Sequence, residues 1–139
     1  MQPVTARLPW GFHRKLAAAF AAVLAAVAAL NYVPFVPRPD GAVFGIFALD
    51  VYDDALHLAS ALWALGAALV SARAARVFLL LFGAAYFSDG LMGFALGSGW
   101  LDLGILNHGV QDLPLSFRAF ANAPHLGLGG LALLGGLRR

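Results

Sequence analysis

The sequence contains no cysteine and no glutamate, and only 12% of its 139 residues are charged. Without cysteine the chain forms no disulfide and offers no thiolate to a metal ion or a substrate. Without glutamate it lacks the Glu–Lys pairs that stabilise the exposed helices of soluble bundles. A soluble domain needs about a quarter of charged residues to cover its surface. This shortage of charge, beside 61% hydrophobic residues, indicates that lipid surrounds much of the chain.

Four apolar stretches follow one another, and a helix needs about 20 such residues to cross the hydrocarbon core of a bilayer. The two-residue alternation of a membrane barrel strand does not run for the required length anywhere. The sequence therefore predicts an all-helical integral membrane domain, a four-helix bundle built from two repeated helical hairpins. The fourth stretch is the shortest and is rich in glycine, so a re-entrant segment is the alternative there. The predicted spans are residues 16–32, 55–72, 77–96 and 123–137.

Basic residues gather at one end of these spans, and loops that carry them stay on the cytoplasmic side of a membrane. Six of the seven aspartates fall on the other side. The pattern predicts a multi-pass protein of a bacterial inner membrane, with both termini in the cytoplasm and two longer loops outside. Arg38 and Arg118 lie outside, whereas seven of the nine basic residues lie inside: Arg7, Arg14, Lys15, Arg73, Arg76, Arg138 and Arg139.

The two outer loops, and the helices that follow them, resemble each other. Residues 45–47 read Gly-Ile-Phe, and residues 104–106 read Gly-Ile-Leu. In each half a polar residue then stands three positions before a histidine that opens a span, as in Asp54-x-x-His57 and Asn122-x-x-His125. Because both halves start and end inside, the repeats would be parallel and would place the two histidines at equivalent depths near the outer face.

The run from residue 45 to residue 57 resembles a family of small bacterial four-span membrane proteins catalogued only as a domain of unknown function. Its signature is a Gly-apolar-apolar motif, an Asn-rich loop, and then Asn-x-x-His at the start of an apolar helix. Asn122 and His125 match the second copy, whereas Asp50 and Asp54 stand where the family usually has Asn. The resemblance implies a topology and no particular activity.

The first stretch has a second interpretation as a secretory signal. Arg14 and Lys15 precede an apolar run that ends in small residues, which is the pattern of a cleaved leader. The family that the chain resembles retains this helix, so we expect a membrane span.

His57 and His125 are the sharpest candidates for a binding site. Two imidazoles at one depth could ligate a metal ion or supply both axial ligands of a haem. The alternative is structural: Asp54 and Asn122 would cap the two helices, because Asp and Asn at that position accept amide hydrogens of the first turn. Capping explains the spacing without a ligand, so no cofactor is expected on that interpretation.

Asp89 is the other candidate, because it lies inside the third span. An acidic residue there costs about 2.5 to 3.5 kcal/mol on insertion, which the strongly apolar residues around it offset. Its carboxyl must then face the bundle interior, with Tyr86, Ser88 and the histidines as available partners. It would bind a metal or another cation, relay protons, or only fix the helix register.

Three functions follow from these features. The first is a non-enzymatic scaffold or accessory subunit, with the lipid bilayer, further copies of the chain or other membrane proteins as partners. The second is a haem- or metal-binding redox protein that uses His57 and His125, with Asp89 as a further metal ligand. The third is a small-solute or proton transporter. No enzymatic activity is expected, because phosphate-binding and hydrolase motifs are missing, and no nucleic-acid partner, because the basic residues form no patch.

Overall fold

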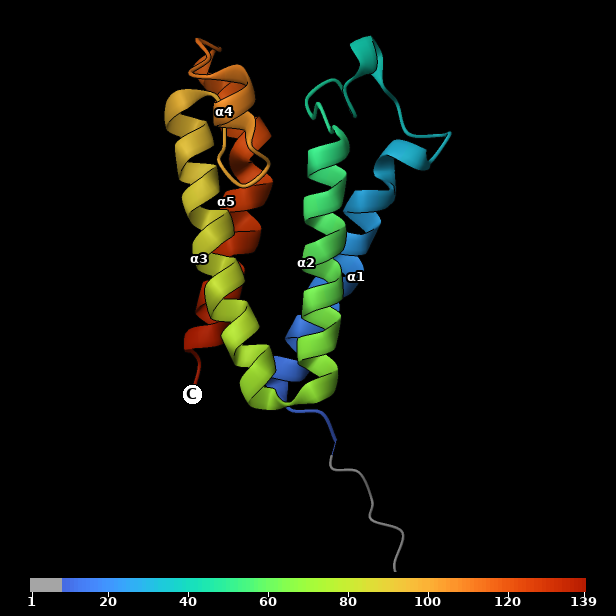
Figure 1. Ribbon diagram of the computed structural model, residues 1–139, viewed down its shortest axis with the longest axis vertical. Helices are drawn as coiled ribbons and strands as arrows, with labels where there is room; N and C mark the ends of the chain where they lie inside the picture. The colour runs from blue at the N-terminus through green and yellow to red at the C-terminus, as the bar shows by residue number, and fades with distance from the viewer. Residues whose placement is uncertain (1–8) are drawn as a thin grey trace, which may run out of the picture.

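The computed structural model describes residues 9–139, and this part of the chain is all-helical (Figure 1). Four helices within it are long, one is short, and two 3-10 turns lie in the first loop. The elements are α1 (Phe12–Ala29), η1 (Leu30–Tyr32), η2 (Pro39–Gly41), α2 (Val51–Val70), α3 (Ala72–Leu96), α4 (Gly104–His108) and α5 (Leu115–Leu137). The prediction of an all-helical chain is confirmed.

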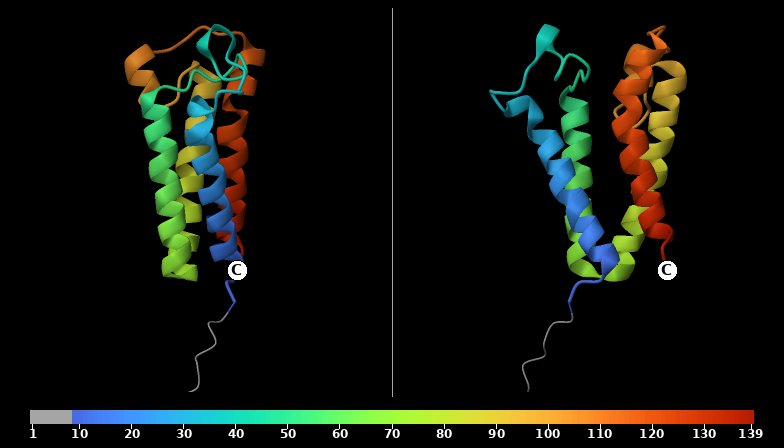
Figure 2. Two further views of the ribbon diagram at one scale, coloured as in Figure 1. Left: turned by 90° about the vertical axis from the view of Figure 1, so that its right-hand side faces the viewer. Right: turned by 180° about the vertical axis from the view of Figure 1, so that it is seen from behind.

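The long helices form two pairs, which we call the N-terminal pair (α1 and α2) and the C-terminal pair (α3 and α5) (Figures 1 and 2). Helix α2 turns directly into α3 at Ser71, and the C-terminus lies at the same end of the molecule. Residues 33–50 and 97–114 lie at the opposite end, which we call the loop end. The two pairs meet near Ser71 and diverge toward the loop end (Figure 2).

Three segments are long and apolar enough to cross a membrane, namely Phe12–Tyr32, Val51–Val70 and Ala72–Leu96. Each begins several residues before the predicted span, because a first turn with polar or charged residues precedes the apolar run. Ser71 shows the effect, since its hydroxyl accepts the backbone N–H of Ala74 at 3.0 Å and starts α3. Hydrophobicity alone marks the apolar part of a helix and misses this first turn.

The start of α2 is set by Asp50, and the prediction that Asp54 caps this helix is wrong. Asp50 Oδ1 accepts the backbone N–H of Tyr52 at 2.8 Å and that of Asp53 at 3.1 Å. The Asp53 carboxylate accepts the Asp50 N–H at 3.1 Å in return, which completes a capping box. Asp54 therefore lies inside the helix, where it accepts a hydrogen bond from the Asn31 side chain at the end of α1.

The prediction that Asn122 caps the last span is also wrong. Helix α5 begins at Leu115, directly after Pro114, so Asn122 lies two turns inside it. There the Asn122 Nδ2 donates to the backbone carbonyl of Arg118 at 2.9 Å. The first half of α5 mixes polar and apolar residues, so hydrophobicity marks only its second half.

Glycines let α3 and α5 pack with their backbones in contact. A Cβ atom on Gly83 would lie 2.7 Å from the backbone nitrogen of Leu133, and one on Gly129 would overlap the backbone of Phe87. Lipid tails are as apolar as the helices, so close backbone approach replaces the hydrophobic effect as the force that holds such a pair together. The C-terminal pair is therefore sensitive to any added volume along this seam.

Two arginines bind helix ends near Ser71. The last carbonyls of a helix have no partner within it, and a membrane interior offers them no water. Arg14 of α1 donates to the carbonyls of Ala68 at 2.6 Å and Leu69 at 3.0 Å, at the end of α2. Arg76 of α3 donates to the carbonyl of Gly136 at 2.8 Å, at the end of α5. Each helix pair thus has its own arginine clamp here.

Two further arginines bind the helix ends at the loop end. Arg38 reaches back from the first loop to carbonyls at the end of α1, including that of Leu30 at 3.0 Å. Arg118 of α5 donates to the carbonyl of Ala95 at 2.8 Å, near the end of α3. These are the two basic residues that the charge pattern places outside the cytoplasm, and each has a structural reason to be there.

We expect Gly129→Ala to lower the free energy of unfolding by about 1 to 3 kcal/mol, because the new methyl group overlaps the backbone of α3. Gly127→Ala is the matched control on the same helix, since a Cβ there meets nothing within 4 Å. That variant should be neutral or stabilising by about 1 kcal/mol through its helix propensity. Unfolding in increasing mole fractions of SDS, followed by circular dichroism, measures both. Equal effects of the two substitutions would contradict the packing described here.

We expect Arg14→Ala to destabilise the protein by about 1.5 to 3 kcal/mol, the cost of removing charged donors from otherwise unpartnered carbonyls. Arg73→Ala removes the same charge at the same end, and Arg73 makes no side-chain hydrogen bond within residues 9–139. Thermal unfolding of the purified protein in detergent should therefore separate the two variants. A similar loss in both would mean that net charge, rather than capping, matters at this end.

Candidate functional site

Asp89 is the buried polar centre of the loop end. It lies on α3 and is 1% exposed. Its Oδ2 lies 2.5 Å from His125 Nδ1 on α5, and its Oδ1 accepts the backbone N–H of Trp100 at 2.6 Å and of Leu101 at 2.8 Å. Gly99 makes this approach possible, because a Cβ there would press on the carboxylate. Asp89 therefore joins α3 to α5 and fixes the segment that follows α3.

The predicted partners of Asp89 are found in part. It faces the interior and meets one of the two histidines, as expected. Ser88 instead points to the surface, where its hydroxyl donates to the backbone carbonyl of Ala85 and lies 3.3 Å from the Trp100 indole nitrogen. Helical geometry explains this, because adjacent residues on a helix cannot face the same side.

His57 and His125 lie together although their helices belong to different pairs. Their ring centroids are 6.1 Å apart, so the two imidazoles are neighbours at the loop end. Neither residue opens its helix, because α2 and α5 both begin earlier than predicted. Whether the two imidazoles hold a haem or a metal ion stays a prediction.

The hydrogen bond of His57 determines which of its two ring nitrogens carries the hydrogen. The side chain is 5% exposed, and its Nδ1 lies 2.7 Å from the backbone carbonyl oxygen of Asp53. A carbonyl oxygen only accepts, so Nδ1 carries the hydrogen and a neutral His57 has a lone pair at Nε2. Within residues 9–139 this Nε2 has no hydrogen-bond partner. His57 is therefore a nearly buried acceptor that is still unused.

Tyr86 lies one turn deeper than Asp89 and contacts both imidazoles. Its ring centroid is 5.0 Å from that of His125 and 6.2 Å from that of His57. Its hydroxyl lies 3.1 Å from the Ser60 hydroxyl, and its ring stacks on Phe82 at 4.0 Å. Tyr86 is 2% exposed and belongs to the core. It closes the site toward the centre of the molecule.

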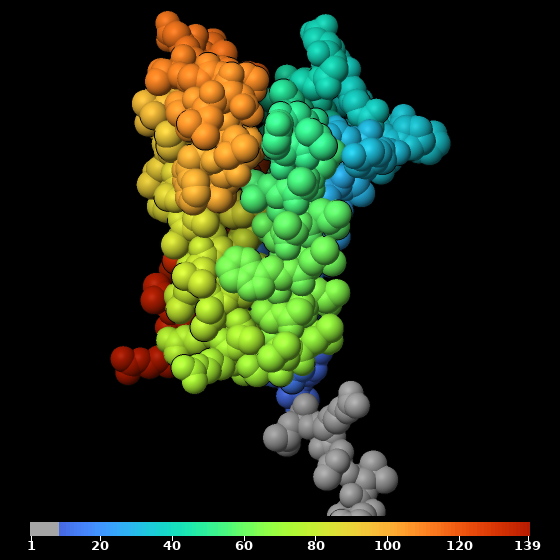
Figure 3. Space-filling model, in the orientation of Figure 1, coloured from blue at the N-terminus to red at the C-terminus, as the bar shows by residue number. Residues whose placement is uncertain are grey.

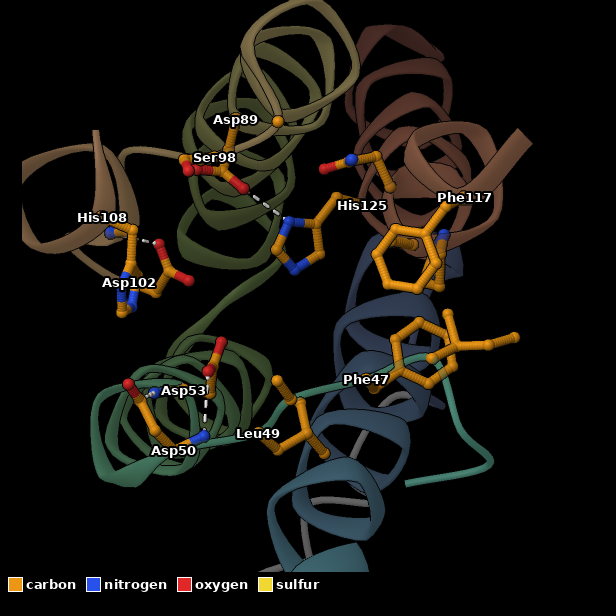
Figure 4. A pocket seen from close by; sticks show the side chains of 18 of the residues that line it. Phe47, Leu49, Asp50, Asp53, Asp89, Ser98, Asp102, His108, Phe117 and His125 are labelled. Carbon is orange, nitrogen blue, oxygen red and sulfur yellow. Dashed lines mark hydrogen bonds and ion pairs between the residues drawn. The ribbon is translucent and has the colours of Figure 1, made fainter. Parts of the chain in front are cut away.

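A cavity of about 510 Å³ lies between the two helix pairs at the loop end. Figure 3 shows its mouth as a notch between the segments before α2 and around α4, and Figure 4 shows its interior. Four aspartates contribute to the walls, and His108 joins the other two histidines there. No lysine or arginine among residues 9–139 lines it. The aspartates are Asp50, Asp53, Asp89 and Asp102.

Asp53, Asp102 and His108 are site residues that the sequence did not single out. Asp53 lies one turn before His57 on the same face of α2, and this four-residue spacing was a usable signal. Asp102 and His108 belong to the second loop, whose path is set by the hydrogen bonds of Asp89. No local pattern marks those two positions.

The predicted metal site of His57, His125 and Asp89 is not formed. Within residues 9–139 no three His or Asp side chains are placed so that they could hold a metal ion. The reason is that the Asp89 oxygens are already taken by His125 and by two backbone amides. Asp89 is a structural anchor, and the remaining groups of the cavity form the candidate site.

A comparison of this chain with protein-family models, curated proteins and solved structures finds no match. The resemblance to the four-span bacterial family stays a prediction. The site must therefore be interpreted from its own geometry.

We expect Asp89→Asn to destabilise the protein by about 1 to 3 kcal/mol, because it removes the charged acceptor of hydrogen bonds from His125 and two backbone amides. The backbone amides of Trp100 and Leu101 should exchange with deuterium faster, since their acceptor loses its charge. Asp112→Asn, in an exposed part of the same loop, should change neither property. Thermal unfolding and hydrogen–deuterium exchange measure the two effects, and unchanged exchange at both amides would contradict the anchoring role.

Proposed function

We propose that this chain is a four-span protein of a bacterial-type inner membrane with both termini in the cytoplasm. Three apolar helices support it, together with an α5 of 23 residues. At 1.5 Å per residue, α5 is about 34 Å long and matches the hydrocarbon thickness of about 30 Å. The Ser71 turn and the C-terminus lie at the end where most of the basic residues gather.

The two helix pairs are, in this proposal, repeats that form a four-helix bundle. Arg14 near the start of α1 and Arg76 near the start of α3 each clamp the end of the partner helix. His57 and His125 meet between the pairs. Both correspondences are those expected of two hairpins related by an axis along the membrane normal.

The function that the geometry supports best is the binding of a small molecule from the outer side. One observation carries this proposal: a cavity of about 510 Å³ whose walls hold carboxylates and a nearly buried imidazole acceptor. Small-molecule sites are typically about 300 to 1,000 Å³, mostly apolar, with a few convergent polar groups. A scaffold or accessory subunit needs no cavity of this size. Binding of a small molecule is therefore favoured over a purely structural role.

Binding is also favoured over transport. Below the two histidines Phe78, Phe82 and Tyr86 are each at most 2% exposed, and their rings stack in sequence. A solute path through the protein would have to part this stack. The cavity is better suited to hold a ligand that enters and leaves at the loop end.

Because the natural chain has no cysteine, single cysteines can test both the topology and the cavity. We expect a membrane-impermeant maleimide to label Ala121→Cys, in the cavity wall, when it is added to spheroplasts. Ala132→Cys should stay unlabelled, since Ala132 is 0% exposed. Arg73→Cys, near the Ser71 turn, should react only after the membrane is opened. Labelling of Arg73→Cys in intact spheroplasts would reverse the topology, and an unreactive Ala121→Cys would show that no outside-facing cavity exists.

A further inference from the structure

The polar wall of the cavity holds carboxyl groups that the protein leaves without a cationic partner. Asp89 is paired with His125, and Asp50 caps α2. Asp53 and Asp102 remain, the first from α2 and the second from the second loop. Each uses one carboxylate oxygen, Asp53 Oδ2 for the Asp50 amide and Asp102 Oδ1 for the Gly104 amide. Their other oxygens have no hydrogen-bond partner within residues 9–139, and no lysine or arginine of these residues lines the cavity.

These carboxylates belong to a built site and not to a surface cluster. Asp53 is only 9% exposed, and His57, which lines the same cavity, is 5% exposed. The unpartnered Nε2 of His57 adds a lone pair to the carboxylate oxygens. All three groups accept hydrogen bonds, so a donor that carries positive charge satisfies them together.

The opposite wall of the cavity is apolar and partly aromatic. Phe47 from the first loop and Phe117 from α5 lie near each other across the cavity from Asp102, with Leu49 beside them (Figure 4). Such a wall favours an apolar body. The site is therefore larger and more apolar than an inorganic cation requires.

We propose that the cavity binds an organic cation: a protonated amine whose charged head lies against Asp53, Asp102 and His57 and whose apolar body lies against Phe47 and Phe117. The alternative of a metal ion is disfavoured, because within residues 9–139 no three His or Asp side chains lie close enough together to ligate one. The inference rests on the proposed function, since it names the ligand class of that same cavity.

The test uses three probes of one shape and different charge: phenylbutylamine, phenylbutanol and phenylbutyrate. Isothermal titration of the purified full-length protein should show the amine binding at least about tenfold more tightly than the alcohol, with the carboxylate weaker still. Asp102→Asn keeps the acceptor for the Gly104 amide and should lower only the amine affinity, by about tenfold. Asp112→Asn is the matched control outside the cavity and should leave all three affinities unchanged.

Phe47→Ala separates the two walls of the site. It should weaken the amine and the alcohol by the same factor, because it removes apolar contact and no charge. Equal binding of amine and alcohol to the natural protein would overturn the proposal. So would an Asp102→Asn protein that binds the amine as tightly as the natural one, or tightest binding of the carboxylate.

Protection of the introduced thiol distinguishes a wrong ligand class from a wrong function. Phenylbutylamine should slow the reaction of Ala121→Cys with maleimide, whereas phenylbutanol at the same concentration should not. A thiol that reacts but is not protected by the amine would refute the organic cation and leave the cavity in place. Protection by Zn²⁺ alone would replace the proposal with a metal site. An unreactive thiol would remove the proposed function itself.

Discussion

The last carbonyl oxygens of a helix have no partner within that helix, a membrane interior offers them no water, and this constraint shapes the whole chain. Each of the four long helices meets it with an arginine that lies outside that helix. Two of these arginines join the helices of one pair near Ser71, and the other two hold the loop end. The same contacts explain why Arg38 and Arg118 depart from the charge asymmetry of the remaining basic residues. The arginines of this chain therefore supply hydrogen bonds to helix-end carbonyls, in addition to any effect of their charge on the orientation of the protein in a membrane.

The buried carboxylate of Asp89 connects this helical frame to the cavity. It binds a histidine of α5 and two amides of the segment after α3, so its hydrogen-bonding capacity is spent on the protein. By fixing that segment it also places Asp102, which faces Asp53 of α2 from the second loop. Asp89 thus decides where one of the free carboxylates lies. Sequence reasoning left Asp89 open between a cation or proton site and a residue that fixes the helix register, and its contacts favour the structural role.

The sequence predicted the helices and their apolar character, because hydrophobic runs carry that information. It left open whether His57 and His125 face each other, since that depends on how the two helix pairs pack. It failed at helix starts. Asp54 and Asn122 have the residue types and the spacing of caps, but Asp50 and Pro114 come earlier in the chain and already precede the helices. The second loop was beyond prediction, since its path depends on long-range hydrogen bonds to Asp89. The acidic wall therefore became visible only in three dimensions.

The two loops contribute opposite chemistry to the cavity. The first loop supplies the apolar Phe47 and Leu49, and the second supplies the polar Asp102 and His108. The helices beneath are held by glycine seams and arginine clamps that no loop residue of the cavity takes part in. Asp53 and His57 of α2 and Phe117 of α5 complete the cavity, so each loop faces groups that the helical frame presents. A substitution in a loop would therefore change one wall of the cavity and leave the seams, the clamps and the helical part of the wall in place.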